Sequence, residues 1–226
     1  KILKIINFCE EKKSIPFAVF KPSGFGRFAL YEKVTEGKTL TEIEQKEWNR
    51  IEGRFHKVCK IAVQKDVPLL IDAEESWMQK AADDLVEVLM ETYNKEKAIV
   101  FNTLQMYRHD RMDYLKELHQ KAQEKGFYIG MKVVRGAYME KERERAEEKG
   151  YPSPICKDKD ATDINYDTAI KYLMEHPKMA LFAGTHNEES SYLVMDLAKE
   201  LGIKENDKNL WFGQLFGMSD HISYNL

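Results

Sequence analysis

A lysine interrupts an apolar run at residues 131–139, MKVVRGAYM, and the run ends in an arginine, a glycine and a tyrosine. A continuous apolar run predicts a strand that is buried on both faces, and parallel sheets and barrels carry their active sites at the carboxyl ends of such strands. An unpaired buried charge is too costly to keep, so Lys132 either extends its amine to water or has a partner. The segment therefore indicates a strand that ends at a chemically active site.

Five other apolar segments also end in polar or small residues. Collected on one face, these ends offer cations, a carboxylate, amides and a single histidine. A lone histidine without a second imidazole nearby does not predict a metal site. The segment ends read FKPSG (20–24), IDAEES (71–76), FNTLQ (101–105), GTHNEES (184–190) and FGQLFGM (212–218).

The elements that must position these ends alternate between strands and helices. Apolar runs predict strands at residues 17–21, 69–72, 99–103, 128–134, 179–185 and 210–215. Helical spacing predicts helices at residues 41–64, 78–93, 112–124, 140–149, 166–176 and 191–201. Thr41 and Glu44 predict a capping box, and Gly126, Gly150 and Gly202 are typical of left-handed helix ends. The apolar face of the first helix is expected to comprise Trp48, Ile51, Phe55, Val58 and Ala62.

Strand starts recur about every 30 or 50 residues, which is the rhythm of βα units. An open doubly wound sheet and a (β/α)8 barrel both fit this rhythm. No GxGxxG follows a strand, and polar groups follow at least five strand ends, so the sequence favours an α/β barrel with one active face. A closed barrel needs eight strands. Residues 1–226 are therefore expected to form a single barrel domain with about six strands, lacking the first strand and the last strand and helix.

The composition is that of an ordinary globular chain. Its 226 residues are 43% hydrophobic and carry 35 Lys and Arg against 38 Asp and Glu, which gives a net charge of -3. This balance gives no reason to expect nucleic-acid binding, and no apolar run approaches the roughly 20 residues that span a bilayer. Three cysteines without a CxxC pair predict neither a disulfide nor a zinc site, and they indicate a reducing compartment. The first residue is lysine, so the natural amino terminus is expected upstream.

The motifs LIDAEE, FNTLQ, VRGAY, THNEES and GQLFGM, in this order and spacing, resemble the proline dehydrogenases of the bacterial monofunctional type. These are flavin enzymes built on a distorted (β/α)8 barrel. The resemblance implies FAD-dependent oxidation of L-proline to Δ1-pyrroline-5-carboxylate, the first step of proline catabolism, with hydride transfer to flavin N5 and then electron transfer to a quinone. It also implies a cytoplasmic enzyme with a peripheral contact at the inner face of a membrane.

The resemblance places two charged residues at the catalytic centre. Asp72 matches the family's active-site aspartate, which can order a neighbouring cation through charge-assisted hydrogen bonding. Lys132 matches a basic residue that approaches flavin N5, where a fixed positive charge makes the ring a better hydride acceptor. Lys21 would lie near the substrate carboxylate. The residues expected to bind substrate are Lys21, Ala137, Tyr138 and Leu215.

A larger set is expected to hold the cofactor. Gln105 would hydrogen-bond the pyrimidine edge of the flavin, Arg135 would pair with its phosphates, and Gly136 would let the backbone approach closely. The residues that the resemblance places against FAD are Ala73, Gln105, Lys132, Arg135, Gly136, Ala137, Thr162, Thr185, His186 and Asn187.

Each assignment has a structural alternative. Lys132 could form a purely structural pair with Asp72, Asp72 could cap the following helix together with Ser76, and Lys21 could simply end a strand in water. Two other functions also stay open, a barrel aldolase that uses Lys132 as a Schiff-base nucleophile and a noncatalytic half-barrel remnant. The family's final-helix pattern YLxRRxxEN, whose arginines clamp the substrate carboxylate, has no match in the chain.

Overall fold

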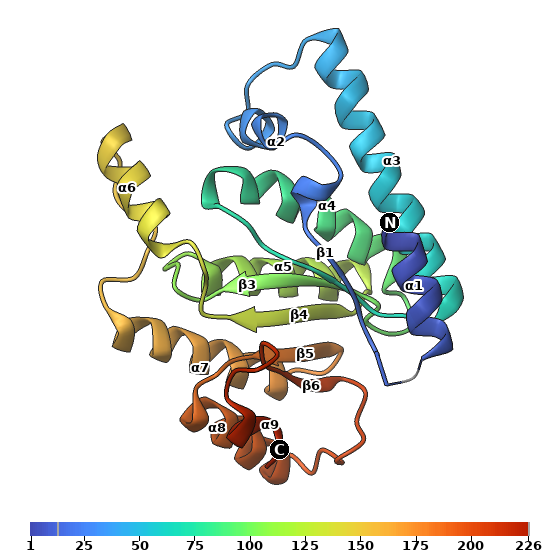
Figure 1. Ribbon diagram of the computed structural model, residues 1–226, viewed down its shortest axis with the longest axis vertical. Coiled ribbons are helices and arrows are strands. Elements are labelled where there is room, and N and C mark those ends of the chain that lie inside the picture. The colour runs from blue at the N-terminus through green and yellow to red at the C-terminus, as the bar shows by residue number, and fades with distance from the viewer. Residues whose placement is uncertain (13, 226) are drawn as a thin grey trace. The chain divides into compact units, whose positions relative to one another are not determined.

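The computed structural model describes residues 1–12 and 14–225 (Figure 1). Contacts divide the chain into two compact units. The first unit comprises Lys1–Thr103 and Gln120–Ile129, and the second comprises Leu104–His119 and Gly130–Leu226. The expected single barrel domain over residues 1–226 stays a prediction.

The strands of the sheet follow one another in the order of the chain, β1-β2-β3-β4-β5-β6. Their bounds are β1 (Ala18–Phe20), β2 (Leu69–Ile71), β3 (Val100–Gln105), β4 (Ile129–Val134), β5 (Met179–Gly184) and β6 (Leu210–Gly213). An open doubly wound sheet reverses its strand order at a switch point, whereas the strands of a barrel follow one another consecutively. The order therefore confirms the α/β class and the barrel topology, with six strands in the part of the chain that the structure describes.

Helices lie in every gap between consecutive strands and at both ends of the described chain (Figure 1). Their bounds are α1 (Ile2–Glu11), η1 (Pro22–Gly24), α2 (Phe28–Thr35), α3 (Glu42–Lys65), α4 (Ser76–Tyr93), α5 (Arg111–Lys125), α6 (Met139–Lys149), α7 (Lys159–Glu175), α8 (Glu188–Glu200) and α9 (Asp220–Ser223). The sequence did not predict α1, α2 or α9. It placed the start of α7 at Tyr166, but Asp158 accepts a hydrogen bond from the backbone N–H of Ala161 at 2.8 Å and caps the helix earlier.

The start of α3 confirms the predicted capping box. Thr41 Oγ1 accepts from the backbone N–H of Glu44 at 3.3 Å, and Glu44 Oε2 accepts from the backbone N–H of Thr41 at 2.8 Å. The predicted apolar face is also buried, and Gly126, Gly150 and Gly202 have positive φ as expected. These local signals were correct because each depends on residues within one or two turns.

Parallel pairing in the first unit brings the ends of β1 and β2 to the same level. Phe20 lies opposite Ile71, and the backbone N–H of Asp72 donates to the carbonyl of Phe20 at 3.0 Å. All residues of β2 and β3 are buried. Lys21 and Asp72, the residues that follow β1 and β2, therefore lie side by side at the ends of a partly exposed strand and a fully buried one.

Backbone pairing in the second unit continues past the ends of the strands. The backbone N–H of Tyr107 donates to the carbonyl of Arg135 at 2.7 Å, and that of Thr185 donates to the carbonyl of Gly213 at 3.1 Å. In the parallel pair of β5 and β6, Gly184 lies opposite Gly213. The segments that follow β3, β4 and β5 are thus held by backbone hydrogen bonds that continue the pairing of the strands.

Candidate functional site

The first unit carries the predicted residues Lys21, Asp72 and Ala73. Lys21 is exposed, Asp72 is half-buried and Ala73 is buried. The residue at the N-cap position of α4 is Glu75, which makes no side-chain capping bond. Asp72 lies three residues before that position, so it is not itself the N-cap residue of α4. The aspartate stands instead at the end of a buried strand, beside the residue that follows β1.

Lys132 in β4 is less buried than its neighbours in the strand. Lys132 and Val134 are half-buried, whereas Met131 and Val133 are buried. Alternate residues share one face of a strand, so Lys132 projects on the more open face. A Cβ atom at Gly184 in β5 would lie 2.9 Å from Val134 Cγ1 and 3.9 Å from Lys132 Cε. Glycine at position 184 therefore lets β5 lie close to Val134, whereas 3.9 Å to Lys132 is an ordinary van der Waals contact.

Arg135, directly after β4, is held by three hydrogen bonds. Its Nε donates to Asp163 Oδ1 at 2.6 Å, its Nη1 to Thr185 Oγ1 at 2.8 Å and its Nη2 to Ser190 Oγ at 3.0 Å. A guanidinium has five N–H donors, so two remain beyond these three bonds. The arginine is therefore fixed in direction and still has donors to offer an anion.

The residues around Arg135 stabilise its positive charge and fix the orientation of its planar guanidinium group. Its guanidinium carbon lies 4.5 Å from the centre of the Tyr166 ring, a cation–π contact with a buried aromatic side chain. Burial acts to raise the pKa of Asp163, but hydrogen bonds from Lys159 and Arg135 outweigh it and hold that pKa below its usual range. Asp163 therefore stays ionised at neutral pH and keeps the arginine in place.

Gly136 forms a turn that a side chain would disrupt. Its φ is +139°, and a Cβ atom there would lie 2.5 Å from the ring of Tyr107. A backbone conformation of this kind favours glycine, because L side chains rarely adopt it. The turn is exposed on its other side, at Gly136 and Ala137. The turn thus has an exposed backbone without side-chain cover at Gly136, and the contact with a cofactor expected there stays a prediction.

The residues after β5 form the start of α8. Asn187 Oδ1 accepts from the backbone N–H of Ser190 at 2.9 Å, so the asparagine is the N-cap of the helix. Thr185 Oγ1 accepts from the backbone N–H of Asn187 at 3.0 Å in addition to its bond with Arg135. Thr185 therefore joins the arginine to the amino end of α8, where backbone N–H groups favour anions.

His186 holds the loop that follows β6. Its Nε2 accepts from the backbone N–H of Leu215 at 3.2 Å, and its Nδ1 lies 3.2 Å from Ser219 Oγ. Because Nε2 accepts, the proton of the neutral ring is on Nδ1, which can donate to the serine. Leu215 is 66% exposed, so it belongs to the surface of the loop and not to the barrel core.

A comparison with protein-family models matches residues 3–226 to the proline dehydrogenase family. The chain belongs to the proline dehydrogenase family. The membership agrees with the motif resemblance in the sequence, and it extends over both compact units.

Curated relatives support the same family. The chain is 37% identical over 227 residues to the carbapenem antibiotics biosynthesis protein CarD of Pectobacterium carotovorum subsp. carotovorum, covering 99% of this chain and 57% of that protein. It is 35% identical over 191 residues to the human mitochondrial proline dehydrogenase 1, covering 83% of this chain and 32% of that protein. The chain thus spans about a third to just over half of the length of these relatives.

A solved structure of a proline utilization A protein confirms the fold. The protein from Bdellovibrio bacteriovorus, inactivated by N-propargylglycine, matches with a TM-score of 0.82 at 20% identity, covering 98% of this chain and 24% of that chain. Six strands in barrel order and this match together show that the chain has a barrel-type α/β fold.

The predicted cofactor residues fall mainly in the second unit. Hydrogen bonds bring Arg135, Thr185 and Asn187 together, and Gly136 follows the arginine directly. Gln105 ends β3 and is 3% exposed. The hydroxyl of Thr162 donates to the carbonyl of Asp158, the N-cap residue of α7, at 3.1 Å.

The sequence alone missed four residues that shape this part of the proline dehydrogenase chain. They are Tyr107, Asp163, Tyr166 and Ser190. Two of these could have been found, because an acid beside Thr162 and a serine after the THNEE motif are types that pair with arginine. The roles of Tyr107 and Tyr166 depend on contacts between distant segments, for which the sequence gives no local signal.

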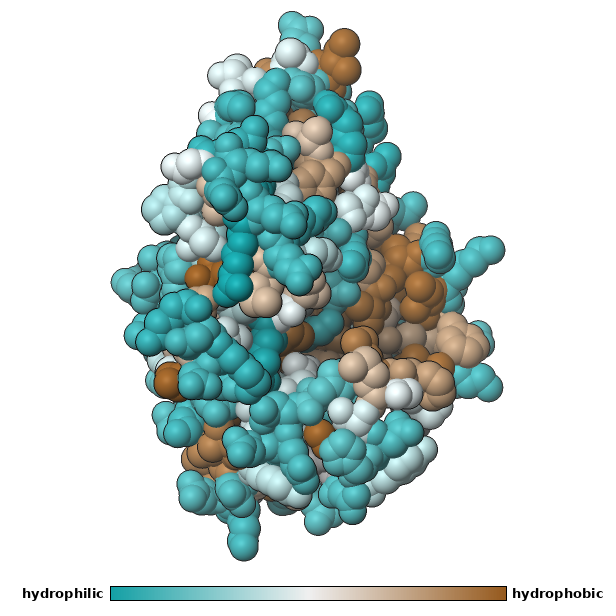
Figure 2. Space-filling model, turned by 60° about the vertical axis from the view of Figure 1, so that its left-hand side comes forward, coloured by the Kyte–Doolittle hydropathy of each residue, from teal (hydrophilic) through white to brown (hydrophobic). Residues whose placement is uncertain are grey.

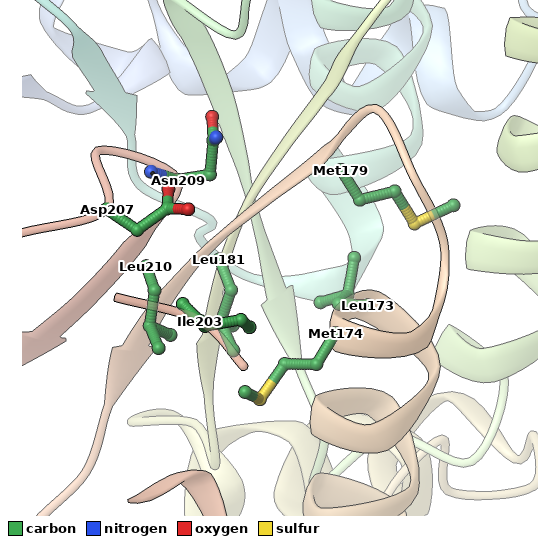
Figure 3. A pocket seen from close by; sticks show the side chains of 8 residues that line it. All are labelled: Leu173, Met174, Met179, Leu181, Ile203, Asp207, Asn209 and Leu210. Atoms are coloured by element: carbon green, nitrogen blue, oxygen red, sulfur yellow. Dashed lines mark hydrogen bonds between the residues drawn. The ribbon is translucent and has the colours of Figure 1, made fainter. Parts of the chain in front are cut away.

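A small pocket lies away from the strand ends that carry the predicted residues (Figure 3). Its volume is about 50 Å³, and it opens beside Met179 and Leu210, the first residues of β5 and β6. It is lined by Leu173, Met174, Met179, Leu181, Ile203, Asp207, Asn209 and Leu210. Barrels place catalysis at the opposite, carboxyl ends of their strands, so this pocket is not the candidate site.

The described residues include no group of three or more His, Cys, Asp or Glu side chains that could hold a metal ion. Across residues 1–12 and 14–225, no helix has the length and apolar character needed to cross a membrane.

Figure 2 shows a largely hydrophilic face on which apolar side chains gather in one area.

Proposed function

We propose that this chain is the barrel region of an FAD-dependent proline dehydrogenase that oxidises L-proline to Δ1-pyrroline-5-carboxylate. The observation that carries the proposal is the anchored guanidinium of Arg135 beside the exposed turn at Gly136. Three protein partners direct the arginine, two of its donors remain, and the turn gives a ligand access to the backbone. These features fit a cofactor that carries phosphates, and the proline dehydrogenase family supports the substrate.

The residues of the second unit would hold the cofactor. Arg135 would donate its two remaining N–H groups to the phosphates, with the amino end of α8 contributing backbone donors nearby. Gln105, buried at the end of β3, would hydrogen-bond the pyrimidine edge of the flavin. When bound, FAD would supply the acceptor for the hydride that leaves proline and would pass the electrons to a quinone. The further proposed contacts are Ala73, Lys132, Gly136, Ala137, Thr162, Thr185, His186 and Asn187.

Three charged residues would handle the substrate. Lys21 would pair with the proline carboxylate, and Asp72, beside it at the ends of β1 and β2, would order a neighbouring cation. Lys132 would keep a fixed positive charge at the reacting centre, where it stabilises negative charge that develops during hydride transfer. Ala137, Tyr138 and Leu215 would form the wall against the substrate ring.

The proposal includes a quinone as the electron acceptor and a peripheral contact of a cytoplasmic enzyme with the inner face of a membrane. Quinones partition into the bilayer, so an enzyme that reduces them must reach the membrane surface. Co-sedimentation of the full-length protein with vesicles, with and without incorporated quinone, tests this part. A protein that stays in the supernatant and reduces only soluble acceptors would contradict it.

The visible spectrum of the full-length protein tests the proposed activity. We expect a yellow protein whose flavin absorbance bleaches under anaerobic conditions when L-proline is added. D-proline is the matched control, because it is the enantiomer of L-proline and carries the same chemical groups. A colourless protein that does not take up FAD, or a flavin that L-proline leaves oxidised, would contradict the proposal. Borohydride trapping of a carbonyl substrate on Lys132 would favour the aldolase alternative.

A further inference from the structure

A buried carboxylate, that of Glu74, holds the turn that follows β1. Glu74 is 5% exposed, and it accepts hydrogen bonds from the backbone N–H of Ser23 at 2.9 Å and from Ser23 Oγ at 2.7 Å. Ser23 lies two residues after Lys21, and Glu74 lies two residues after Asp72. One carboxylate therefore joins the two segments that carry the proposed substrate lysine and the proposed active-site aspartate.

A chain of buried polar groups fixes Glu74 in turn. Gln79 Oε1 accepts from the backbone N–H of Glu74 at 2.8 Å, and Gln79 Nε2 donates to Asp83 Oδ1 at 2.8 Å. Asn102 in β3 donates to the same oxygen of Asp83 at 2.8 Å. The exposed fractions of Gln79, Asp83 and Asn102 are 1%, 2% and 1%. A buried network of this kind rigidifies its members, because each broken bond leaves a desolvated polar group without a partner.

Two more side chains hold the turn on either side of Ser23. Tyr31 Oη, in α2, donates to the carbonyl of Pro22 at 2.9 Å, and Arg54, in α3, donates to the carbonyl of Phe25. Burial, with the nearby charge of Glu74, raises the pKa of the Tyr31 phenol, so the hydroxyl stays protonated and remains a donor. Side chains from three separate segments thus hold a turn that is only a few residues long.

The free-energy cost of burying the Glu74 carboxylate indicates a functional role in addition to a structural one. A carboxylate taken out of water destabilises a protein unless hydrogen bonds compensate it, and an ordinary exposed turn needs no buried charge. Functional side chains, in contrast, work only when their supporting residues hold them to within a fraction of an ångström. The turn at Ser23 is the backbone from which the Lys21 side chain extends.

We propose that Glu74 is a positioning residue for Lys21, which it places for the substrate carboxylate by fixing the turn at Ser23. This inference rests on the proposed function of the site. It assigns no contact between Glu74 and the substrate or the cofactor. Its effect should therefore appear in the binding of L-proline and not in the binding of FAD.

The test compares variants of Glu74 in the full-length holoenzyme. In Glu74→Ala both bonds to Ser23 are lost, so we expect faster amide hydrogen exchange in residues 21–25 and a KM for L-proline raised about tenfold, with a smaller change in kcat. In Glu74→Gln the side-chain oxygen can accept from the backbone N–H of Ser23 and the side-chain amide NH2 can donate to Ser23 Oγ, so exchange and KM should stay near wild type. The FAD content should be unchanged in both.

Two further variants keep the test decisive. Ser23→Ala removes one of the two bonds, so it should raise KM by about twofold to threefold even if Glu74→Ala folds poorly. Asp84→Ala breaks an exposed ion pair with Lys80 on the same helix, α4, and should change neither exchange nor KM.

If Glu74→Ala shows faster amide hydrogen exchange but a wild-type KM for L-proline, the contact between Glu74 and Ser23 is purely structural. That result would overturn the positioning role. Wild-type exchange in Glu74→Ala would overturn it as well. A wild-type protein that does not oxidise L-proline would instead overturn the proposed function, and the exchange data would still report whether Glu74 fixes the turn.

Discussion

At the scale of single residues, Lys132 is a half-buried cation between two buried residues of β4, Met131 and Val133. It shares the more open face of the strand with Val134. A Cβ atom at Gly184 in the neighbouring strand β5 would lie only 2.9 Å from Val134 Cγ1, so the two strands pack closely there. The charge of Lys132 thus stands on a face that is only partly open to water.

Lys132→Met should slow flavin reduction by L-proline about a hundredfold, because the methionine keeps the size of the side chain and removes the charge that stabilises the developing anion. FAD content should be retained. Rapid mixing under anaerobic conditions measures the rate, and Lys171→Met, at an exposed position of α7, is the control. Reduction at the wild-type rate would show that the lysine has no such role.

At the scale of elements, the turn after β4 depends on two segments that lie far apart in the sequence. The ring of Tyr107, from the loop after β3, occupies the space where a side chain at position 136 would lie. The same loop is tied to the turn by the bond from the backbone N–H of Tyr107 to the carbonyl of Arg135. The geometry of the turn is therefore set by packing and by glycine together.

Gly136→Ala should weaken FAD binding at least tenfold and lower the melting temperature, because the new methyl group would strain the backbone and displace Tyr107. Gly150→Ala is the matched control. Gly150 also has a positive φ, of +71°, but nothing lies within 4 Å of the point where a Cβ atom would stand. Its cost should be limited to about 1 kcal/mol of backbone strain. FAD titration and thermal melts distinguish the two, and equal effects would contradict the role of Tyr107.

The loop after β3 also contains an ion-pair cluster that makes stability depend on pH. Burial acts to raise the pKa of Asp110, but Arg108 and Arg111 outweigh it and lower the pKa to about 2. The folded pKa lies below that of an unfolded aspartate, about 3.9, so the stabilisation is complete above pH 4 and is lost as the pH falls towards 2.

Asp110→Asn should therefore unfold at lower urea concentration than wild type at pH 6, with a smaller difference near pH 2. Urea midpoints measured across this range check the expectation. Asp113→Asn, at an exposed position of α5, is the control. A difference that stays constant with pH would assign the stabilisation to packing and not to the charge of Asp110.

The elements that the sequence predicted are those whose signals are local. The strands were found because their apolar runs end in polar residues, and α3 because Thr41 and Glu44 mark its start. The start of α7 was misplaced because its first turns are polar, and the apolar spacing begins only at Tyr166. Asp163 lies in those turns, so the misplaced start also hid the partner of Arg135.

At the scale of the whole molecule, the residues with proposed roles come from both compact units. Lys21 and Asp72 belong to the first unit, whereas Arg135 and its partners Asp163 and Thr185 belong to the second. The sequence could predict the residue types at each strand end through the family motifs. It could not predict this division, because the contacts that define a unit join residues from many segments.

Because Lys21 and Asp163 belong to different units and have different proposed roles, we expect their substitution to weaken substrate binding and cofactor binding separately. Lys21→Met should raise the KM for L-proline about tenfold with an unchanged Kd for FAD, and Asp163→Asn should weaken FAD binding about tenfold, since each loses one charged partner. Asp196→Asn, at an exposed position of α8, is the control. Parallel losses of both affinities in either variant would contradict the separation.

The consecutive order of the strands also has a consequence for synthesis on the ribosome. Each strand of this sheet pairs with the strand made just before it. A chain that emerges from its amino end can therefore extend its sheet one βα unit at a time, and no early strand has to wait for a partner encoded much later. Doubly wound sheets, which insert later strands beside the first one, lack this property. The growing edge is then exposed only for the time needed to translate one further unit.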